Sequence, residues 1–583
     1  MSWRFGTLTA PAPGRRSSDS CRDRPTRLDF AVITRPSIAL IVLTLLPAVP
    51  SIARAQCRFP ASRAGQALTY RFQAEVTPDG LVLHVTVEFQ AGATGTTVLA
   101  VPTHWAGETL RALTNLRAVT TGASIEDGAD ADAKLLHAEA NRPVQVSYDL
   151  KKDWDGPLVN PKQFHPVLTP QYFEFSGNNA LVRPQRDNDT NTTANFDWQR
   201  LPPSWVVATS FGAGASAGDR CQTYSGKSID IIHGLYAAGD FRVRRFKIGR
   251  RAAVLAVRGT WTFTDDEAMA QIQKVVGVVR DFWRDDNFPY FLVTLKPYDR
   301  DTGSSDGSAF TNAFWMYISR QDSFASLLPQ LAHEAFHAWN VARMGALSNE
   351  ADRATTWFKE GFTNYYAYLL LYRAGVLPAR TYVDSLNQDL RKFPTSNDPY
   401  VRGRILALWL DAAIRRDSQG QRSLDDVMFD MVRTSTQSIT LARTLDTAGR
   451  YLSADARRQL QRAVVEHGDL AAPEAVPSLG ACVRPALEDL PTFDLGFDLA
   501  ASATAKQAVG VVPDGPAFAA GLRNGQVLGR ISVYNGQADR LATVIVRTDN
   551  GDQPIAFYPR GKAIPGWQYR LDQGGSCGAN SVK

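Results

Sequence analysis

Residues 333–337 read His-Glu-Ala-Phe-His, an HExxH pentapeptide inside an apolar stretch. Apolar residues recur at steps of three and four from position 327 to position 342, which predicts a half-buried helix. One helical turn separates His333 from His337, so both imidazoles lie on one face and can share one cation. Glu334 lies roughly 100° around that helix. It is therefore placed as a general base for a water that the cation activates, rather than as a ligand.

A hydrolytic zinc site needs three protein ligands and one open position for water. Helical spacing continues over residues 355–366, where Gly361 would let two helices approach closely. Glu360 is the only acidic residue in this segment. On its own it would be a solvated surface residue, but the HExxH motif upstream favours a ligand. We therefore expect His333, His337 and Glu360 to bind Zn²⁺.

Three stretches form a specific set of motifs. They are His-Glu-Ala-Phe-His-Ala-Trp-Asn at 333–340, Trp-Phe-Lys-Glu-Gly-Phe-Thr-Asn-Tyr-Tyr at 357–366, and Tyr-Val-Arg-Gly-Arg-Ile-Leu-Ala-Leu-Trp at 400–409. Together they resemble the glycyl aminopeptidase-like zinc metallopeptidases of the gluzincin type. The resemblance runs from about Cys57 to the C-terminus. It implies a multidomain α+β protein with an N-terminal β-sandwich, a thermolysin-like, mainly helical catalytic domain and a C-terminal PDZ-like domain.

The resemblance also implies a catalytic role for Tyr400. In related enzymes a tyrosine at this position is placed to donate a hydrogen bond to the tetrahedral oxyanion. A phenol suits this role, because it is a neutral donor at pH 7 that can be aimed at developing charge. The alternative is a tyrosine that packs at the start of a helix.

One stretch departs from the family pattern. Family aminopeptidases carry a Gly-Gly-Leu-Glu-His-type strand before the zinc helix, and its glutamate is suited to holding the substrate's free amino group. The comparable stretch here is 304–315, and no glutamate occurs between Asp286 and His333. Asp306 is the candidate replacement, although its shorter side chain would shift the geometry. Both exopeptidase and endopeptidase cleavage therefore stay open.

The sequence pI of 9.0 comes almost entirely from the N-terminal end. Residues 1–55 contain eight Arg and three Asp, a local charge of +5 out of a net +6. Subtracting them from the 64 basic and 58 acidic side chains leaves 56 and 55. The rest of the chain is thus nearly neutral, and its charge gives no reason to expect a nucleic-acid partner.

An apolar run at 37–49 follows Arg35 and precedes Ala-Arg-Ala at 53–55, a small-x-small cleavage site. We expect residues 1–31 to be a leader that precedes the true start at Val32, and residues 32–55 to be a signal peptide. The run is short for a transmembrane helix. The sequence therefore predicts a periplasmic or secreted bacterial protein with no stable membrane anchor; an uncleaved anchor is the alternative.

Four cysteines remain after the leader: Cys57, Cys221, Cys482 and Cys577. An even number in an exported chain suggests two disulfides, for which three pairings are possible. A Cys57–Cys221 bond would tie the N-terminal domain, and a Cys482–Cys577 bond would bracket the last one.

The pattern along the chain divides it into three parts. Alternation of apolar and polar residues, as in Leu-Val-Leu-His-Val-Thr-Val-Glu-Phe at 81–89, predicts a β-sandwich over residues 56–250. A helical pattern follows, and we assign the catalytic domain to residues 251–470. A linker rich in Ala and Pro then opens a PDZ-like domain over residues 471–583.

The last part contains two PDZ-like stretches, Phe-Asp-Leu-Gly-Phe-Asp-Leu at 493–499 and a glycine-rich stretch at 510–525. Leu495, Gly496 and Phe497 would offer backbone N–H groups to a terminal carboxylate, with the peptide added as a strand. The alternative is a degenerate PDZ domain that serves only as a spacer.

The sequence thus predicts a zinc-dependent peptidase, of aminopeptidase type, that acts on peptides or proteins with Glu334 as general base. One alternative is an endopeptidase or oligopeptidase. The other is a weakly active relative that binds peptides through its PDZ-like domain. The complete set of His333, Glu334, His337 and Glu360 argues against the latter, because a scaffold has no need for a general base.

Overall fold

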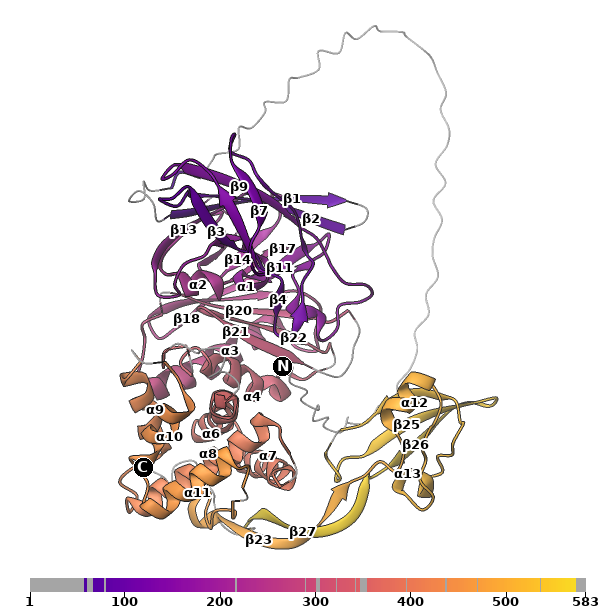
Figure 1. Cartoon of the computed structure of the whole chain (residues 1–583). Helices are drawn as coiled ribbons and strands as arrows, with labels where there is room; N and C mark the ends of the chain where they lie inside the picture. The colour runs from indigo at the N-terminus through magenta and orange to yellow at the C-terminus, as the bar shows by residue number, and fades with distance from the viewer. Residues whose placement is uncertain are drawn as a thin grey trace, which may run out of the picture.

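The computed structural model describes residues 57–59 and 67–572, apart from positions 78–79, 215, 217, 289, 300–304, 321, 341, 346–353, 395, 436–437, 469 and 535. The predicted leader, the predicted signal peptide and Cys577 lie outside the described residues. The described chain is a multidomain α+β protein. Stacked β-sheets come first, helices follow, and a small β-rich module lies near the C-terminus (Figure 1).

Two facing sheets make up most of the N-terminal region. The outer sheet has the order β16-β13-β1-β2-β9-β6, formed by β1 (Ala67–Thr77), β2 (Gly80–Gln90), β6 (Leu113–Ala118), β9 (Pro143–Leu150), β13 (Asn191–Arg200) and β16 (Cys221–Lys227). The middle sheet has the order β10-β11-β17-β14-β15, formed by β10 (Val167–Leu168), β11 (Tyr172–Ser176), β14 (Val206–Thr209), β15 (Gly212–Gly214) and β17 (Leu235–Gly239).

Smaller elements lie at the margin of these two sheets. They are β3 (Thr96–Ala100), β7 (Ser124–Asp127), β8 (Ala133–His137) and β12 (Arg183–Pro184) in a four-stranded sheet, the pair β4 (His104–Trp105) and β5 (Glu108–Thr109), and the short helices η1 (Lys162–Phe164), α1 (Gly177–Ala180) and α2 (Ser228–Ile232).

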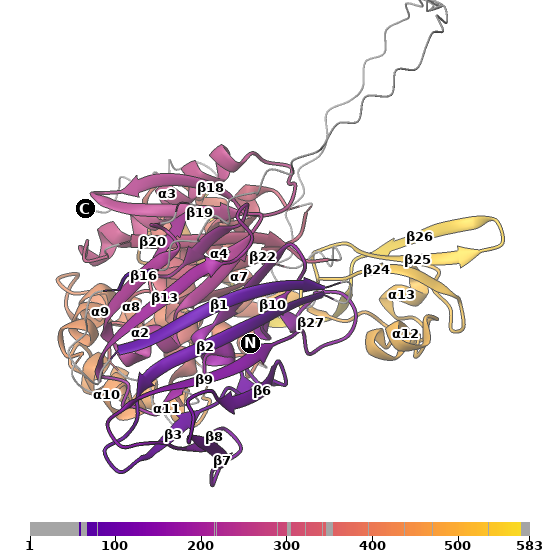
Figure 2. The same ribbon diagram turned by 90° about the horizontal axis from the view of Figure 1, so that it is seen from above.

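The alternating burial of its residues shows that one face of the outer sheet packs on the middle sheet. Every second residue of β2 is buried, so this strand presents one face to the core and one toward solvent. Phe72 and Trp198 of the outer sheet lie in one core with Phe173 and Phe175 of the middle sheet. Figure 2 shows the outer strands side by side from above. The N-terminal region is therefore a β-sandwich.

A third sheet, which we call the catalytic sheet, packs against the other face of the middle sheet. Its order is β18-β19-β20-β22-β21, with β18 (Arg242–Ile248), β19 (Arg251–Val257), β20 (Tyr290–Pro297), β21 (Asp306–Phe310) and β22 (Ala313–Ile318). All five residues of β11 and of β17 are buried, because the middle sheet is covered on both faces. Tyr172 and Leu235 of the middle sheet share a core with Leu292 and Trp315 of the catalytic sheet.

This sheet differs from the mainly helical catalytic domain expected over residues 251–470. The predicted boundary at 250/251 falls inside the β18–β19 hairpin, and three more strands precede the zinc-motif helix. The reason is burial on both faces. All six residues of β22 are buried, so no alternation marks it as a strand, and short apolar runs do not distinguish strand from helix.

Helices cover the remaining face of the catalytic sheet (Figure 1). They are α3 (Asp265–Trp283), α4 (Phe324–Phe336), the π-helix η2 (Trp357–Phe362), α6 (Thr363–Arg373), α7 (Ala379–Lys392), α8 (Pro399–Asp417), α9 (Leu424–Arg433), α10 (Leu441–Gly449) and α11 (Ala454–Val465). Within the described residues, none of the helices is both long and apolar enough to cross a membrane.

Two glycines allow η2 to lie directly against α8. A Cβ added to Gly361 would lie 2.2 Å from Cα of Gly403, and one added to Gly403 would lie 1.9 Å from the carbonyl oxygen of Trp357. The close approach of two helices expected at Gly361 is therefore observed, and its partner is the helix that begins beside Tyr400.

The C-terminal part differs from a single domain over residues 471–583. Strands β23 (Val483–Phe493) and β27 (Arg560–Leu571), preceded by η3 (Gly480–Cys482), form a two-stranded ribbon. Val483 and Tyr569 of this ribbon belong to the core of the helical region, and Asn387 of α7 bonds the backbone of Tyr569. The ribbon is thus continuous with the helical region at one end.

A separate module lies at the other end of the ribbon (Figures 1 and 2). It consists of β24 (Leu528–Ser532), β25 (Ala542–Thr548), β26 (Gly551–Phe557), α12 (Leu499–Ala505) and α13 (Pro516–Ala519), around its own small core.

One predicted disulfide is present. Cys57 and Cys221 are bonded, with their Cα atoms 5.5 Å apart, and the bond joins the start of the described chain to β16. The Cys482–Cys577 bond stays a prediction, since Cys577 lies outside the described residues.

Candidate metal centre

Helix α4 presents the two histidines of the HExxH motif to one point. The helix ends at Phe336, earlier than the apolar pattern predicts, and His337 is its C-cap residue with φ −61° and ψ −18°. The N–H of His337 still donates to the carbonyl of His333 at 3.2 Å, so the one-turn spacing is kept. The two imidazole nitrogens Nε2 lie 3.0 Å apart.

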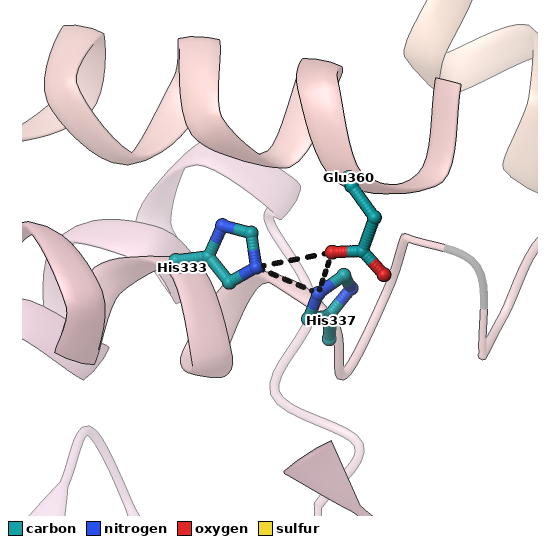
Figure 3. A group of neighbouring side chains, drawn as sticks. All are labelled: His333, His337 and Glu360. Carbon is teal, nitrogen blue, oxygen red and sulfur yellow. Dashed lines mark hydrogen bonds and ion pairs between the residues drawn. The ribbon is translucent and has the colours of Figure 1, made fainter. Parts of the chain in front are cut away.

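Glu360 reaches the same point from η2 (Figure 3). Its Oε2 lies 3.3 Å from Nε2 of His333 and 3.3 Å from Nε2 of His337. This carboxylate stands on a π-helical turn where the sequence predicts a regular helix. A π turn is wider than an α-helical turn, and here it is the turn directly before α6 that carries Glu360. Such turns are frequent at functional sites.

The spacing of these three atoms fits a zinc ion. Zinc bonds of about 2.0–2.1 Å in a tetrahedral arrangement place neighbouring ligand atoms about 3.3 Å apart. Among the described residues, His333, His337 and Glu360 are the group of His, Cys, Asp and Glu side chains that could hold a metal ion. The structure therefore brings together all three residues proposed as ligands from the sequence.

The outer nitrogens of both imidazoles have oxygen partners. Nδ1 of His333 lies 3.1 Å from Oδ1 of Asn364, and Nδ1 of His337 lies 2.8 Å from the carbonyl of Asn340. Both oxygens accept hydrogen bonds, so each Nδ1 carries the proton and each Nε2 presents a lone pair. Two lone pairs that face each other at 3.0 Å repel, and a bound cation relieves that repulsion.

Burial sets the charge state of these groups. Burial, followed by the neighbouring His337, lowers the pKa of His333 to about 4, which keeps its imidazole neutral. The pKa of Glu360 is held well below its usual value, because His337, His333 and Lys359 outweigh the opposing effect of burial. A neutral imidazole and an ionised carboxylate are the forms that bind zinc.

Glu334 lies beside the cluster with its carboxylate against the backbone of Gly307. The side chain is buried, and burial raises its pKa to about 8, with smaller contributions from Glu360 and Asp306 in the same direction. A Cβ added to Gly307 would lie 2.5 Å from Oε1 of Glu334. Gly307 was not among the predicted site residues. A glycine directly after the candidate residue Asp306 could have indicated a close approach of another group to the backbone.

Tyr400 lies at the first turn of α8, where Asp398 caps the helix by accepting from the N–H of Tyr400 at 2.9 Å. Its ring centroid is 6.2 Å from that of His333. The phenol thus stands beside the metal centre and not in a distant packing position.

Asp306 does not fit the predicted contact with a substrate amino group. The residue is 1% exposed, Oδ1 accepts from Nδ2 of Asn160 at 2.8 Å, and Oδ2 accepts from the hydroxyl of Tyr298 at 2.6 Å. Successive residues of a strand point to opposite faces, and Gly307 faces Glu334. The carboxylate of Asp306 therefore points to the other face of β21, toward the middle sheet.

The predicted carboxylate-binding loop of the PDZ-like part is also different. The N–H of Gly496 donates to Oδ1 of Asp494 at 2.8 Å, and the side chains of Leu495 and Phe497 are buried in the core of the module. Residues 499–505, which follow the loop, form helix α12. A peptide would meet no strand edge in that segment, so strand addition at Leu495, Gly496 and Phe497 does not fit this structure.

Comparisons with known proteins were made for sequence and for fold. The M61 glycyl aminopeptidase family matches residues 326–405, a span that contains His333, Glu334, His337, Glu360 and Tyr400. No curated protein matches the sequence.

Many solved structures match this chain, among them the following two. An aminopeptidase N family protein from Idiomarina loihiensis is 16% identical, with a TM-score of 0.62 over 87% of this chain and 98% of that chain. An M1 zinc metallopeptidase from Deinococcus radiodurans is 14% identical, with a TM-score of 0.49 over 71% of this chain and 95% of that chain. The family match over residues 326–405 and the His-His-Glu cluster support a zinc metallopeptidase, a peptide hydrolase of aminopeptidase type, and the Idiomarina loihiensis protein is similar in fold.

Proposed function

We propose that His333, His337 and Glu360 hold the zinc ion and that Glu334 is the general base in peptide-bond hydrolysis. The observation that carries this proposal is the convergence of two Nε2 atoms and one carboxylate oxygen within 3.0–3.3 Å, with a second carboxylate, that of buried Glu334, beside them. Zinc in such a site lowers the pKa of water and polarises a carbonyl.

Glu334 supplies the proton acceptor. It stands next to His333 in the chain but lies around the helix from the two ligands, so its carboxylate can take a proton from the attacking water without binding the metal. A carboxylate in a buried setting is a stronger base than one in water, because burial disfavours its ionised form. The same carboxyl group can return the proton to the leaving amine.

Tyr400 is proposed as a donor to the oxyanion. Its place at the start of α8, close to His333, supports this role. A phenol donates a hydrogen bond without introducing a charge, and a donor that is already positioned needs no reorganisation when the oxyanion forms.

Strand β21 is proposed as the platform for the substrate. It is the edge strand of the catalytic sheet, and its residue Gly307 lies against Glu334. An extended peptide that adds to this edge would pass beside the general base. For an aminopeptidase the first peptide bond lies there, and the substrate is a peptide with a free amino end.

A second candidate, cleavage of internal bonds by an endopeptidase or oligopeptidase, is favoured by one observation. The residues of β21 on the Glu334 side are Gly307 and Ala309, and neither carries a carboxylate. A free α-ammonium in a partly desolvated site needs an anionic partner, because an unpaired buried charge is costly.

Replacement of Glu334 by Gln separates binding of the metal from chemistry. We expect Glu334→Gln to keep one zinc per chain and to lower kcat by about two to four orders of magnitude, since shape is preserved and only the base is lost. Metal analysis and peptide hydrolysis measure the two quantities.

The matched control is Glu360→Ala, which should lose tight zinc binding together with activity. Activity of Glu334→Gln within a few-fold of the parent would contradict the role of the base. Stoichiometric zinc in Glu360→Ala would contradict the ligand assignment.

Gly307→Ala tests the contact between β21 and the base. The added Cβ should displace the carboxylate of Glu334 and lower kcat by about ten-fold to a hundred-fold, with zinc content unchanged. Gly277→Ala is the control, because a Cβ at that position in α3 meets nothing within 4 Å. Equal activity of both variants would show that Gly307 does not position Glu334.

Blocked and free peptides of one sequence distinguish exopeptidase from endopeptidase cleavage. An aminopeptidase releases the first residue of the free peptide and leaves the N-acetylated peptide intact. Mass spectrometry of the products reads out the cleaved bond. Efficient cleavage of the N-acetylated peptide at an internal bond would establish the second candidate instead.

We also propose that the protein is exported. The Cys57–Cys221 bond supports this, since structural disulfides persist in oxidising compartments. The mature chain should begin at Gln56 after translation from Val32. N-terminal sequencing of protein recovered outside the cytoplasm checks this, and a peptide from residues 1–31 in that material would contradict it.

A further inference from the structure

A pocket of about 400 Å³ opens at the margin of the N-terminal sandwich. Its lining comes from the end of β3, the strand β4, the loop before β8, the helix α1 and the strand β12; the lining residues are Ala100, Val101, Pro102, Thr103, His104, Ala131, Asp132, Asn178 and Arg183. A volume of this size is ordinary for a small-molecule site and is ample for one side chain or one chain end.

Arg183 is the dominant charge in this pocket. Its side chain is half-buried, and burial lowers the pKa of the guanidinium. Nη1 donates to the carbonyl of Leu181 at 3.2 Å, and among the described residues no carboxylate oxygen lies within 4.0 Å of the guanidinium. A guanidinium has five N–H donors, and the bond to Leu181 uses one of them.

Neutral polar groups accompany Arg183. Asn178 contributes an amide with no hydrogen-bond partner among the described residues. Thr103 and His104 pair with each other, with Oγ1 of Thr103 3.0 Å from Nδ1 of His104. Asp132 is the one acidic lining residue; it is exposed, and its charge has only a small effect on Arg183.

Two contacts join the margin of this pocket to β21. The ring centroid of Trp105, which follows His104 in β4, lies 6.1 Å from that of Phe310 in β21. The carbonyl of His233 also accepts from the N–H of Thr311, in the turn after β21.

A partly desolvated guanidinium without a counter-ion is costly, and an anion that enters the pocket offsets that cost. The planar fork of arginine matches a carboxylate with two parallel hydrogen bonds. Peptides carry carboxylates at the C-terminus and on Asp and Glu side chains. We propose that the pocket at Arg183 binds a carboxylate of the peptide substrate. This rests on the proposed peptidase function, because it assumes that a peptide lies in the adjacent site.

The test measures binding rather than turnover, using the zinc-loaded Glu334→Gln protein and calorimetry. Three alanine tetrapeptides serve as probes: one with an amidated C-terminus, one with a free C-terminus, and one amidated peptide with a single Asp. At least one carboxylate-bearing peptide should bind more tightly than the neutral one. Arg183→Met should remove that advantage, by about ten-fold or more, and leave the neutral peptide unchanged.

The two carboxylate probes distinguish the two sources. Loss of affinity for the free C-terminus alone assigns the pocket to the chain end, and loss for the Asp peptide alone assigns it to a side chain. Arg142→Met, on an exposed arginine of the β8–β9 connection, is the control and should change neither. Equal affinities of Arg183→Met and the parent for all three probes would overturn the proposal.

A second pair of variants avoids any change at Arg183, whose replacement could disturb packing. Ala131 is exposed and lines the pocket. Ala131→Glu places a competing carboxylate there, and Ala131→Gln places a neutral group of the same size. The Glu variant should bind carboxylate peptides more weakly than the Gln variant. Identical affinities of the two would overturn the proposal, whereas failure of the proposed peptidase function would appear separately, as absence of peptide hydrolysis by the zinc-loaded parent protein.

Discussion

The metal centre depends on the tie between the end of α4 and the turn η2. Asn340, which is fully buried, makes that tie. Its carbonyl accepts from Nδ1 of His337, and its Nδ2 donates to Oγ1 of Thr363 at 2.9 Å and to the carbonyl of Lys359 at 3.2 Å. One residue thus orients the imidazole of His337 through its backbone carbonyl and fixes the segment that carries Glu360 through its side-chain amide. Three ligand atoms can meet at about 3 Å only if both segments are rigid, because small displacements destroy a zinc geometry.

The position of the N-terminal sandwich over this centre is fixed by buried polar contacts. Lys296 of the catalytic sheet pairs with Glu174 of the middle sheet, and Thr294 and Tyr317 also contact that carboxylate. Both charged side chains are buried, so the pair adds little net stability but any shift between the sheets would leave a charge unpaired.

Local spacing was enough to predict that His333, His337 and Glu360 cluster, whereas non-local pairing hid much of the fold. Helix geometry alone predicts that His333 and His337, one turn apart, lie on the same face. Glu360 was the only acidic residue in its segment and therefore the only candidate there for a third ligand. By contrast, β22 is buried on both faces and shows no alternation. The partner of β23 is β27, on the far side of the small module, and no pattern within either strand indicates it. The π-helical turn at Glu360 lies against α8, and no local pattern indicates that contact either.

The residue of β21 that faces Glu334 determines which groups of a substrate can be bound there. The sequence pointed to Asp306, but strand alternation turns Asp306 toward Tyr298 and Asn160 and turns Gly307 toward Glu334. The carboxylate of Asp306, the predicted partner of a substrate amino group, therefore accepts hydrogen bonds from Asn160 and Tyr298 on the face of β21 opposite Glu334. Lys359 pairs with Glu360 at the cluster, whereas Arg183 has no carboxylate oxygen within 4.0 Å among the described residues. If Arg183 holds a substrate carboxylate as proposed, the charge of the substrate becomes a property that this protein discriminates.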